Sequence, residues 1–258
     1  MKKNHLSDVS ILIPVRLDSI FRLENLMASV RYLSRNTDAR IIVLHADRYD
    51  NGIIKKLLPA TVEYHFVKDN DDVFYRTMYI NMMVKMTNTP IIAVWDADVI
   101  IPQTQILKSV EDIRNGFDMS YPYDGHFYDT SPVIRDLYIS ERNISLLTKN
   151  TGKMNLIYGD DLKGGAFFAN RLKYMNSGME NENFYGWGPE DYERYARWNV
   201  LGYRISRIRG NLYHLTHPRG ANSTYRSQQQ IRSTNREHMN TMCSSKEEIL
   251  EHLSKNVL

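Results

Sequence analysis

The chain has 258 residues, of which 42% are hydrophobic and 24% are charged, and its formal net charge at pH 7 is +3. These values are typical of a soluble globular protein with one large α/β domain or two small ones. The mild charge gives no case for a nucleic-acid partner, although it leaves room for peripheral contact with an anionic membrane. Cys243 is the single cysteine, which excludes an internal disulfide framework and favours a reducing compartment. We find no signal-peptide pattern and no transmembrane segment, so we expect a cytoplasmic protein.

Residues 9–86 alternate between apolar runs and helical patterns. The pattern predicts strands at Val9–Val15, Arg40–Leu44 and Thr61–Val67, and helices after the cap residue Ser19, around Asn51–Leu58 and at about Tyr75–Met86. The first strand is almost entirely apolar, as in a parallel sheet that is buried on both faces. We therefore predict an α/β fold with a central, mostly parallel sheet and right-handed crossovers. In such sheets ligands bind beyond the carboxyl ends of the strands, where Arg16 and Asp47 lie.

A fourth predicted strand begins at Pro90 and runs to two carboxylates, Asp96 and Asp98. In an extended strand this spacing puts both side chains on one face. Two like charges at the end of a buried strand are costly unless a positive group lies beside them, and a hard divalent cation such as Mn2+ or Mg2+ would serve. The plainer alternative is that both are loop-facing acids after a core strand. A D-x-D pattern alone leaves the two interpretations open.

The pattern is less regular in the second half of the chain. A helix is predicted from Pro102 to about Asn115, the periodicity weakens from Phe117 to Gly159, and a glycine pair leads into a short strand at Gly164–Asn170. Residues 223–258 form a polar tail in which we expect a helix at Lys246–Leu253.

The segment Phe184–Glu193 holds the densest group of chemically interesting residues. Pro189 suits the first turn of a helix, which would place Glu190 and Asp191 at the helix N-terminus. The helix dipole favours ionised carboxylates there, which is a purely structural reason for the acids. It does not explain Trp187, which stands between two glycines beside them. Together these residues resemble a sugar platform next to a carboxylate pair.

Two histidines, His214 and His217, follow a predicted strand at Tyr203–Ile208. They can converge on one metal only if the backbone turns between them, and Pro218 favours a local bend. A lone histidine is more often a structural residue. Two of them, in a chain whose D-x-D pair already calls for a cation, indicate at least one metal ligand.

Taken together and in their order along the chain, these motifs resemble those of an inverting glycosyltransferase of the GT-A fold. The resemblance is nearest to the β-1,4-galactosyltransferase and chondroitin polymerase type. Ile13–Arg16 is similar to the uridine-contacting I-P-F-R segment of that family, and Phe74–Arg76 is similar to its F-N-R. Trp95–Asp98 fits the D-x-D metal motif. The likeness covers roughly Val9–Gly220, and its specificity lies in the order and co-occurrence of the motifs.

The remaining motifs of the family fall in the second half. Gly164–Gly165 and Gly186–Asp191 resemble the G-G and W-G-G-E-D motifs. The two histidines fall where the family has a metal-binding M-x-x-H, or Y-H-x-x-P-P in the polymerases. Two departures bear on acceptor choice and metal ligation, since Pro189 replaces a glycine and His214 replaces a methionine.

The resemblance implies a role for each group of residues. Asp191 would be the catalytic base and Glu190 would position sugar hydroxyls, while Asp98 with His217 or His214 would hold Mn2+ or Mg2+. The donor nucleotide-sugar would be bound by Pro14, Val15, Arg16, Asp47, Phe74, Arg76, Asp96, Gly165 and Trp187. It further implies a single Rossmann-like domain at residues 1–222, with a nucleotide-binding part at about 8–100, an acceptor-binding part at about 101–222, and a tail at 223–258.

The implied reaction moves a hexose, galactose or N-acetylgalactosamine, from a UDP-sugar to a saccharide or glycolipid acceptor with inversion, in bacterial polysaccharide synthesis. Three alternatives stay open. A sugar nucleotidyltransferase would usually carry a glycine-rich phosphate loop after the first strand, which Pro14–Asp18 lacks. A non-catalytic carbohydrate-binding protein would explain Trp187 but would not need a nucleotide half. A retaining transferase of the same fold would form the opposite anomer.

Overall fold

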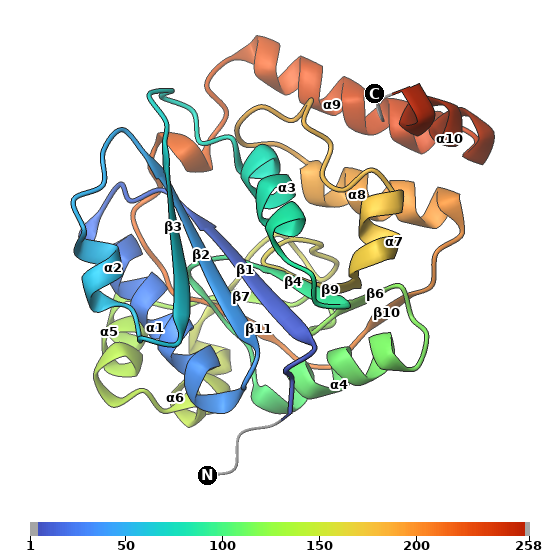
Figure 1. Cartoon of the computed structure of the whole chain (residues 1–258). Coiled ribbons are helices and arrows are strands. Elements are labelled where there is room, and N and C mark those ends of the chain that lie inside the picture. The colour runs from blue at the N-terminus through green and yellow to red at the C-terminus, as the bar shows by residue number, and fades with distance from the viewer. Residues whose placement is uncertain (1–4, 256–258) are drawn as a thin grey trace.

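The computed structural model describes residues 5–255. A twisted central sheet runs through the molecule, with helices packed around it (Figure 1). Within the described residues, seven strands follow the order β10-β6-β9-β4-β1-β2-β3. Their bounds are β1 (Val9–Val15), β2 (Arg40–Asp47), β3 (Val62–Lys68), β4 (Ile91–Trp95), β6 (Met119–Tyr121), β9 (Ala166–Asn170) and β10 (Ile205–Arg207). Neighbours pair in parallel, except that β9 is antiparallel to both β4 and β6. The predicted α/β fold with a mostly parallel sheet is confirmed.

The helices that cover the sheet begin where the sequence indicates. All seven residues of β1 are buried, as the apolar run predicts. α1 (Ile20–Asn36) begins at Ser19, whose side chain accepts a hydrogen bond from the backbone N–H of Arg22. α3 (Arg76–Met86) packs against β1 and β2, and α4 (Gln103–Arg114) packs against β6 and β9. α3 and α4 thus cover different halves of the sheet.

The direction of β9 brings a distant segment to the ligand-binding edge of the sheet. Parallel strands β1 and β4 have their carboxyl ends at one edge. Because β9 runs the opposite way, its amino end, which follows Gly164 and Gly165, lies at that same edge. The backbone N–H of Asp96 donates to the carbonyl of Gly165 at 2.9 Å. The D-x-D turn and the glycine pair are thereby fixed side by side.

A second, smaller sheet holds the histidine segment in place. Its strands are β5 (Val99–Ile100), β11 (Leu212–His214), β7 (Phe127–Asp129) and β8 (Asn155–Leu156), in the order β5-β11-β7-β8. In this sheet His214 stands opposite Val99 on β5 and opposite Asp129 on β7. The next residue, Leu215, donates its N–H to the carbonyl of Asp98 at 2.8 Å. This pairing places the end of β11 beside the D-x-D turn.

The remaining α-helices have between 5 and 16 residues. They are α2 (Ile53–Leu57), α5 (Pro132–Glu141), α6 (Ile144–Lys149), α7 (Arg171–Asn176), α8 (Glu190–Leu201), α9 (Gln228–Cys243) and α10 (Lys246–Lys255). The predicted tail helix lies within α10, whereas α9 was not predicted. Figure 1 shows α9 lying alongside α8, and the two are in contact. Among the described helices, none combines the length and the apolar sequence that a membrane crossing needs.

Candidate functional site

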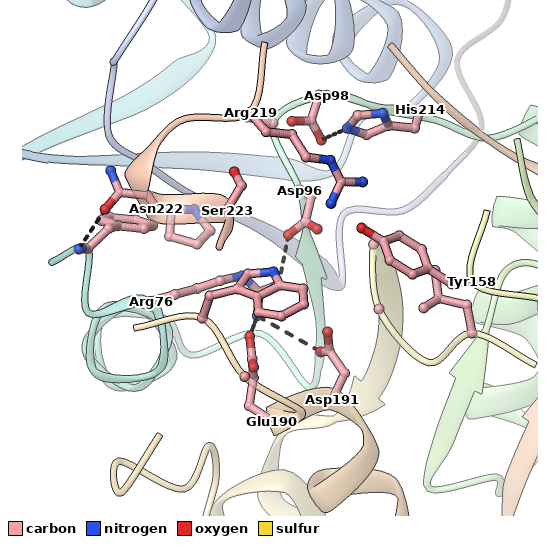
Figure 2. A pocket seen from close by; sticks show the side chains of 18 of the residues that line it. Arg76, Asp96, Asp98, Tyr158, Glu190, Asp191, His214, Arg219, Asn222 and Ser223 are labelled. Atoms are coloured by element: carbon pink, nitrogen blue, oxygen red, sulfur yellow. Dashed lines mark hydrogen bonds and ion pairs between the residues drawn. The ribbon is translucent and has the colours of Figure 1, made fainter. Parts of the chain in front are cut away.

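A cavity of about 340 Å³ opens at the carboxyl edge of the sheet (Figure 2). Its walls come from the ends of β1, β4 and β11, the starts of α3, α8 and β9, and the loop after β11. It collects most residues that the sequence predicted for the site, namely Pro14, Val15, Arg16, Phe74, Arg76, Asp96, Asp98, Gly165, Trp187, Glu190, Asp191, His214 and His217. Asp47 is not among the lining residues; its carboxylate accepts the backbone N–H of Arg48 at 2.7 Å.

Asp98, His214 and His217 form a cluster with the composition of a metal site. One ligand atom from each lies within 4.8 Å of the others. Nε2 of His217 is 3.1 Å from Asp98, and Nε2 of His214 is 3.6 Å from Asp98. One carboxylate and two imidazoles suit Mn2+ or another divalent first-row metal.

Each histidine ring of this cluster is oriented through its other nitrogen. Nδ1 of His214 is 2.7 Å from a carboxylate oxygen of Asp129, and Nδ1 of His217 donates to the carbonyl of Pro218 at 2.9 Å. A ligating histidine is commonly held in this way, because the partner on one nitrogen fixes the tautomer and aims the other nitrogen at the metal. Both Nε2 atoms thus face Asp98, and the residues present fit a divalent cation.

The charges of the cluster respond to one another. Burial favours the neutral acid at Asp98, yet the neighbouring His214 and His217 hold the pKa of this carboxyl well below its usual value. Burial likewise opposes charge on His214, but Asp98 and Asp129 raise its pKa to about 9. Without a metal, Asp98 is therefore an anion beside the cationic imidazole of His214. A divalent cation would replace the proton of His214.

The two carboxylates of the D-x-D motif do not share one face of a strand, so that expectation is wrong. β4 ends at Trp95, and a turn separates it from β5. Asp96 accepts a hydrogen bond from Nη2 of Arg76 at 2.7 Å, whereas Asp98 faces the histidines. Because the backbone turns between them, the two side chains point to different partners. Asp98 belongs to the candidate metal cluster, and Asp96 belongs to a second cluster around Arg76.

Arg76, the first residue of α3, is surrounded by carboxylates (Figure 2). Besides Asp96, its Nη1 lies 3.8 Å from Glu190 and 3.9 Å from Asp191. This Nη1 is buried and has no hydrogen-bond partner among the described residues. The pKa of Asp96 is raised. Burial is the main cause and the neighbouring Asp98 adds to it, whereas Arg76 acts in the opposite direction. The guanidinium therefore balances part of the negative charge on this wall and keeps one donor for a ligand.

Glu190 and Asp191 open α8, as the sequence predicts, with Pro189 as the preceding cap residue. Burial, reinforced by Asp191 and opposed by Arg76, raises the pKa of Glu190 to about 8. Its Oε2 is buried without a hydrogen-bond partner in the part of the chain that the structure describes. A carboxyl group with this pKa is mostly protonated at pH 7, so Glu190 can donate a hydrogen bond.

Asp191 is fixed by neighbours on both sides. Its Oδ1 accepts a hydrogen bond from Nη2 of Arg194 at 2.7 Å, and Arg194 is itself buried and bound to both oxygens of Glu180. Its Oδ2 approaches Gly164 so closely that a Cβ at this position would lie 2.7 Å away. The first glycine of the pair is therefore required for the observed position of Asp191.

The guanidinium of Arg16 is bound to other residues of the cavity wall, so its charge is already paired. Its side chain donates to the carbonyls of Ala46 and Asp71 at 3.0 and 2.8 Å and forms an ion pair with Asp69. Its guanidinium lies 5.6 Å from the ring centre of Phe74. Arg16 and Phe74 thus form a rigid edge of the predicted nucleotide pocket.

Sequence reasoning missed several residues that line the cavity, namely Arg22, Tyr158, Arg219, Asn222, Ser223 and Tyr225. Figure 2 shows Arg219 and Tyr158 reaching in from different segments, with the guanidinium 5.5 Å from the ring centre. Asn222 accepts the backbone N–H of Phe74 at 3.2 Å. Arg22 lies on α1, and the other five lie between β8 and β9 or after β11, where the sequence has no clear periodicity. For these five, the available signal was their nearness in sequence to Gly164 or His217.

Residues 159–219, which hold the glycine pair, the Trp187 segment and both histidines, match a family model described as the N-terminal domain of galactosyltransferase. No match was found among curated proteins.

Three solved structures are similar in fold. The catalytic domain of Drosophila β1,4-galactosyltransferase 7, in complex with xylobiose, is 17% identical over 86% of this chain and 76% of its own, with a TM-score of 0.54. A Pyrobaculum calidifontis mannosyltransferase with GDP-mannose and Mn2+ is 13% identical over 83% and 58%, with a TM-score of 0.53. Glucosyl-3-phosphoglycerate synthase from Mycobacterium tuberculosis, with Mn2+, UDP and phosphoglyceric acid, is 13% identical over 81% and 71%, with a TM-score of 0.50. The predicted resemblance is confirmed at the level of the fold.

Proposed function

We propose that this chain, which has the fold of the GT-A glycosyltransferases, transfers a hexose from a UDP-sugar to a saccharide or glycolipid acceptor with inversion. The observation that carries the proposal is the arrangement of two clusters in one cavity. Asp98, His214 and His217 form a candidate cation site, and Glu190 and Asp191 lie at the start of α8 in the same cavity. The galactosyltransferase match over residues 159–219 favours galactose or N-acetylgalactosamine as the hexose.

The cation cluster would lower the cost of breaking the bond between sugar and diphosphate. Asp98, His214 and His217 would hold Mn2+ or Mg2+, which neutralises negative charge as it grows on the leaving diphosphate. Mn2+ is favoured over Mg2+, because two of the three ligands are imidazoles. Arg76 adds a second positive charge on the opposite wall, with its buried Nη1 available to an anionic or hydroxyl oxygen.

The proton of the acceptor hydroxyl would go to Asp191. Because Arg194 occupies Oδ1, the other oxygen, Oδ2, is the one that can accept this proton. As the acceptor oxygen bonds to C1 of the hexose, the C1–O bond to the diphosphate breaks and its electron pair leaves with UDP. Glu190, which keeps its own proton near neutral pH, would donate a hydrogen bond to a sugar hydroxyl. The two acids of one motif would thus act in different protonation states.

The proposal also includes the pathway and the compartment in which the enzyme acts. A role in bacterial polysaccharide synthesis in the cytoplasm is consistent with a saccharide acceptor and with the absence of a membrane-spanning helix among the described residues.

A panel of nucleotide sugars tests the proposal. Thermal shift and hydrolysis should be measured with UDP-galactose, UDP-N-acetylgalactosamine, UDP-glucose and UDP alone, in Mn2+, in Mg2+ and in EDTA. We expect Mn2+-dependent stabilisation by UDP and Mn2+-dependent hydrolysis of one galacto-configured donor. Asp98→Asn should keep the fold and lose the Mn2+-dependent part, whereas Glu111→Gln, an exposed acid on α4, should behave as wild type.

The same panel distinguishes the alternatives. Sugar binding without any response to UDP would indicate a carbohydrate-binding protein, and release of diphosphate from UTP with a sugar 1-phosphate would indicate a nucleotidyltransferase. The anomer of the first transfer product, determined by NMR, separates inversion from retention.

A further inference from the structure

Helix α9, which precedes the last helix α10, holds the loop that carries Trp187. Nε2 of Gln230 donates to the backbone carbonyls of Tyr185 and Trp187, each at 3.1 Å. This loop leads directly into α8, and α9 lies alongside α8 (Figure 1). One side chain from the C-terminal tail thereby satisfies two carbonyls on either side of Gly186.

Two further residues of α9 contact the same region from the same side of the helix. A Cβ on Gly188 would lie 3.2 Å from Thr234, so the loop backbone packs directly on this threonine. One carboxylate oxygen of Glu237 accepts hydrogen bonds from the side chains of Asn181 and Asn183, at 2.8 and 2.9 Å. Gln230, Thr234 and Glu237 recur at the spacing of one helix face. One face of α9 therefore packs along the chain from Asn181 to Gly188.

The indole of Trp187 is held by the segment that leads into α9. Its ring packs edge-on against Tyr225, with 4.6 Å between the ring centres and 82° between the planes. Both rings line the cavity, and Glu190 follows only three residues after Trp187. The position of this aromatic side chain in the cavity therefore depends on residues 225–237, outside the motif that contains it.

We propose that α9 supports the donor-sugar site from outside the cavity and that Gln230 is a positioning residue, which holds the Trp187 loop in its sugar-binding conformation. This inference rests on the proposed function, in which Trp187 is the sugar platform. The loop contains Gly186, with φ of +83°, and Gly188. Glycines leave such a loop many conformations, and ordering it only upon binding would weaken the affinity for the sugar. Hydrogen bonds from α9 order it beforehand.

The substitution Gln230→Glu tests this role with little change of shape. A carboxylate cannot donate to the two carbonyls, although it still can accept the backbone N–H of Arg226, which Oε1 of Gln230 accepts at 2.8 Å. The matched control is Gln229→Glu, which introduces the same charge on an exposed side of the same helix. Circular dichroism should show that both variants keep their helices.

The first readout is the fluorescence of Trp187, and it needs no ligand. Of the three tryptophans in the chain, Trp95 and Trp198 are fully buried, whereas Trp187 lines the cavity. Quenching by the neutral molecule acrylamide therefore reports mainly on Trp187. We expect stronger quenching in Gln230→Glu than in wild type and in Gln229→Glu. Equal quenching in all three proteins would overturn the inference.

The second readout separates the sugar from the nucleotide. With Mn2+ present, we expect the dissociation constant for UDP-galactose or UDP-N-acetylgalactosamine to rise about tenfold in Gln230→Glu, on the scale of two lost hydrogen bonds, while that for UDP changes by less than about twofold. An equal loss for UDP and the UDP-sugar would show a general structural role and overturn the inference. If wild type binds none of these ligands, the proposed function fails, and the quenching measurement still decides the role of Gln230.

Discussion

Two acids in one cavity, Asp98 and Glu190, have almost the same exposure and opposite ionisation. Their residues are 5% and 7% exposed, and burial raises the pKa of both. Two histidines beside Asp98 nevertheless bring its pKa well below the usual value, whereas Asp191 beside Glu190 helps to raise its pKa to about 8. Burial makes the pKa of each carboxyl sensitive to neighbouring charges, and the sign of those charges decides whether the pKa rises or falls.

This contrast divides the cavity into two chemical sides. The Asp98 side presents a fixed anion with two imidazoles, which suits a cation that neutralises a diphosphate. The Glu190 side presents a carboxyl that keeps its proton beside an aspartate paired with Arg194, which suits hydrogen bonding and proton transfer to sugar hydroxyls. Pairs of acids whose surroundings separate their pKa values in this way commonly have separate roles in catalysis.

The largest expected effect comes from removing the proton acceptor on the Glu190 side. Asp191→Asn keeps the shape and the contact with Arg194 but cannot take the acceptor proton. Turnover should fall by about 10²–10⁴-fold, the contribution of a positioned base, while Mn2+ and UDP affinities stay near wild type. Steady-state kinetics and calorimetry measure the two. Glu141→Gln, an exposed acid on α5, is the control. Turnover within a few-fold of wild type in Asp191→Asn would move the base to Glu190.

On the Asp98 side, both histidines should matter for the metal. Each presents Nε2 to Asp98 while its Nδ1 is occupied, so the geometry does not single out one ligand. We expect His214→Ala and His217→Ala each to weaken Mn2+ binding by more than about 100-fold, beyond the range of residues that only orient a ligand. Calorimetry with Mn2+ measures this, and His65→Ala on β3 is the control. Unchanged Mn2+ affinity in the double variant would remove both from the site.

Asp129 should have a smaller effect on the same measurement. It does not belong to the cluster of candidate ligands, but its carboxylate lies 2.7 Å from Nδ1 of His214. Asp129→Asn should weaken Mn2+ binding by about 10–100-fold, as for other residues that orient a metal-binding histidine. The double variant Asp129→Asn/His214→Ala should bind Mn2+ no worse than His214→Ala alone, because Asp129 acts through that ring. Additive losses would contradict this route.

The sequence could predict the nucleotide half of the fold because its elements are locally encoded. β1 is a continuous apolar run, and Ser19 caps the helix that follows, so pattern and structure agree. In the region from Phe117 to Gly159, strands such as β8 (Asn155–Leu156) have two exposed residues and exist because β7 pairs with them. α9 escaped prediction for a related reason, since Thr234 is its one fully buried residue among those described. Tertiary contacts define these elements.

The candidate site was predictable to the extent that its residues occur in dense motifs. Asp98, His214 and His217 were grouped from their spacing, and the structure brings them together. The different partners of Asp96 and Asp98 depend on a turn that the D-x-D pattern does not specify. Gln230 shows the limit most clearly, because its contact with the Trp187 loop joins residues more than forty positions apart. Nothing in a run of polar residues indicates such a contact.

The raised pKa of Glu190 also predicts a pH dependence of stability. Its pKa in the folded protein is about 8, above the usual value of 4.5 for a glutamate. Below about pH 4.5 the carboxyl is protonated in both states and has no effect. As the pH rises toward 8, the unfolded chain releases this proton while the folded protein keeps it, so folding becomes less favourable by at most about 1.4 kcal/mol per pH unit. Glu190→Gln lacks this group, so its stability advantage over wild type should grow between about pH 5 and pH 8 and then level off.

Urea denaturation of the metal-free proteins at a series of pH values measures this difference. Glu111→Gln is the matched control, since an exposed acid on α4 should give a curve parallel to that of wild type. A curve for Glu190→Gln that is also parallel to wild type would mean that Glu190 is ionised in the folded protein at neutral pH. Arg76 would then be strong enough to hold both acids of the motif as anions, and the contrast with Asp98 would disappear. A growing gap would establish that Glu190 keeps its proton into the neutral pH range, as donation of a hydrogen bond from Glu190 to a sugar hydroxyl requires.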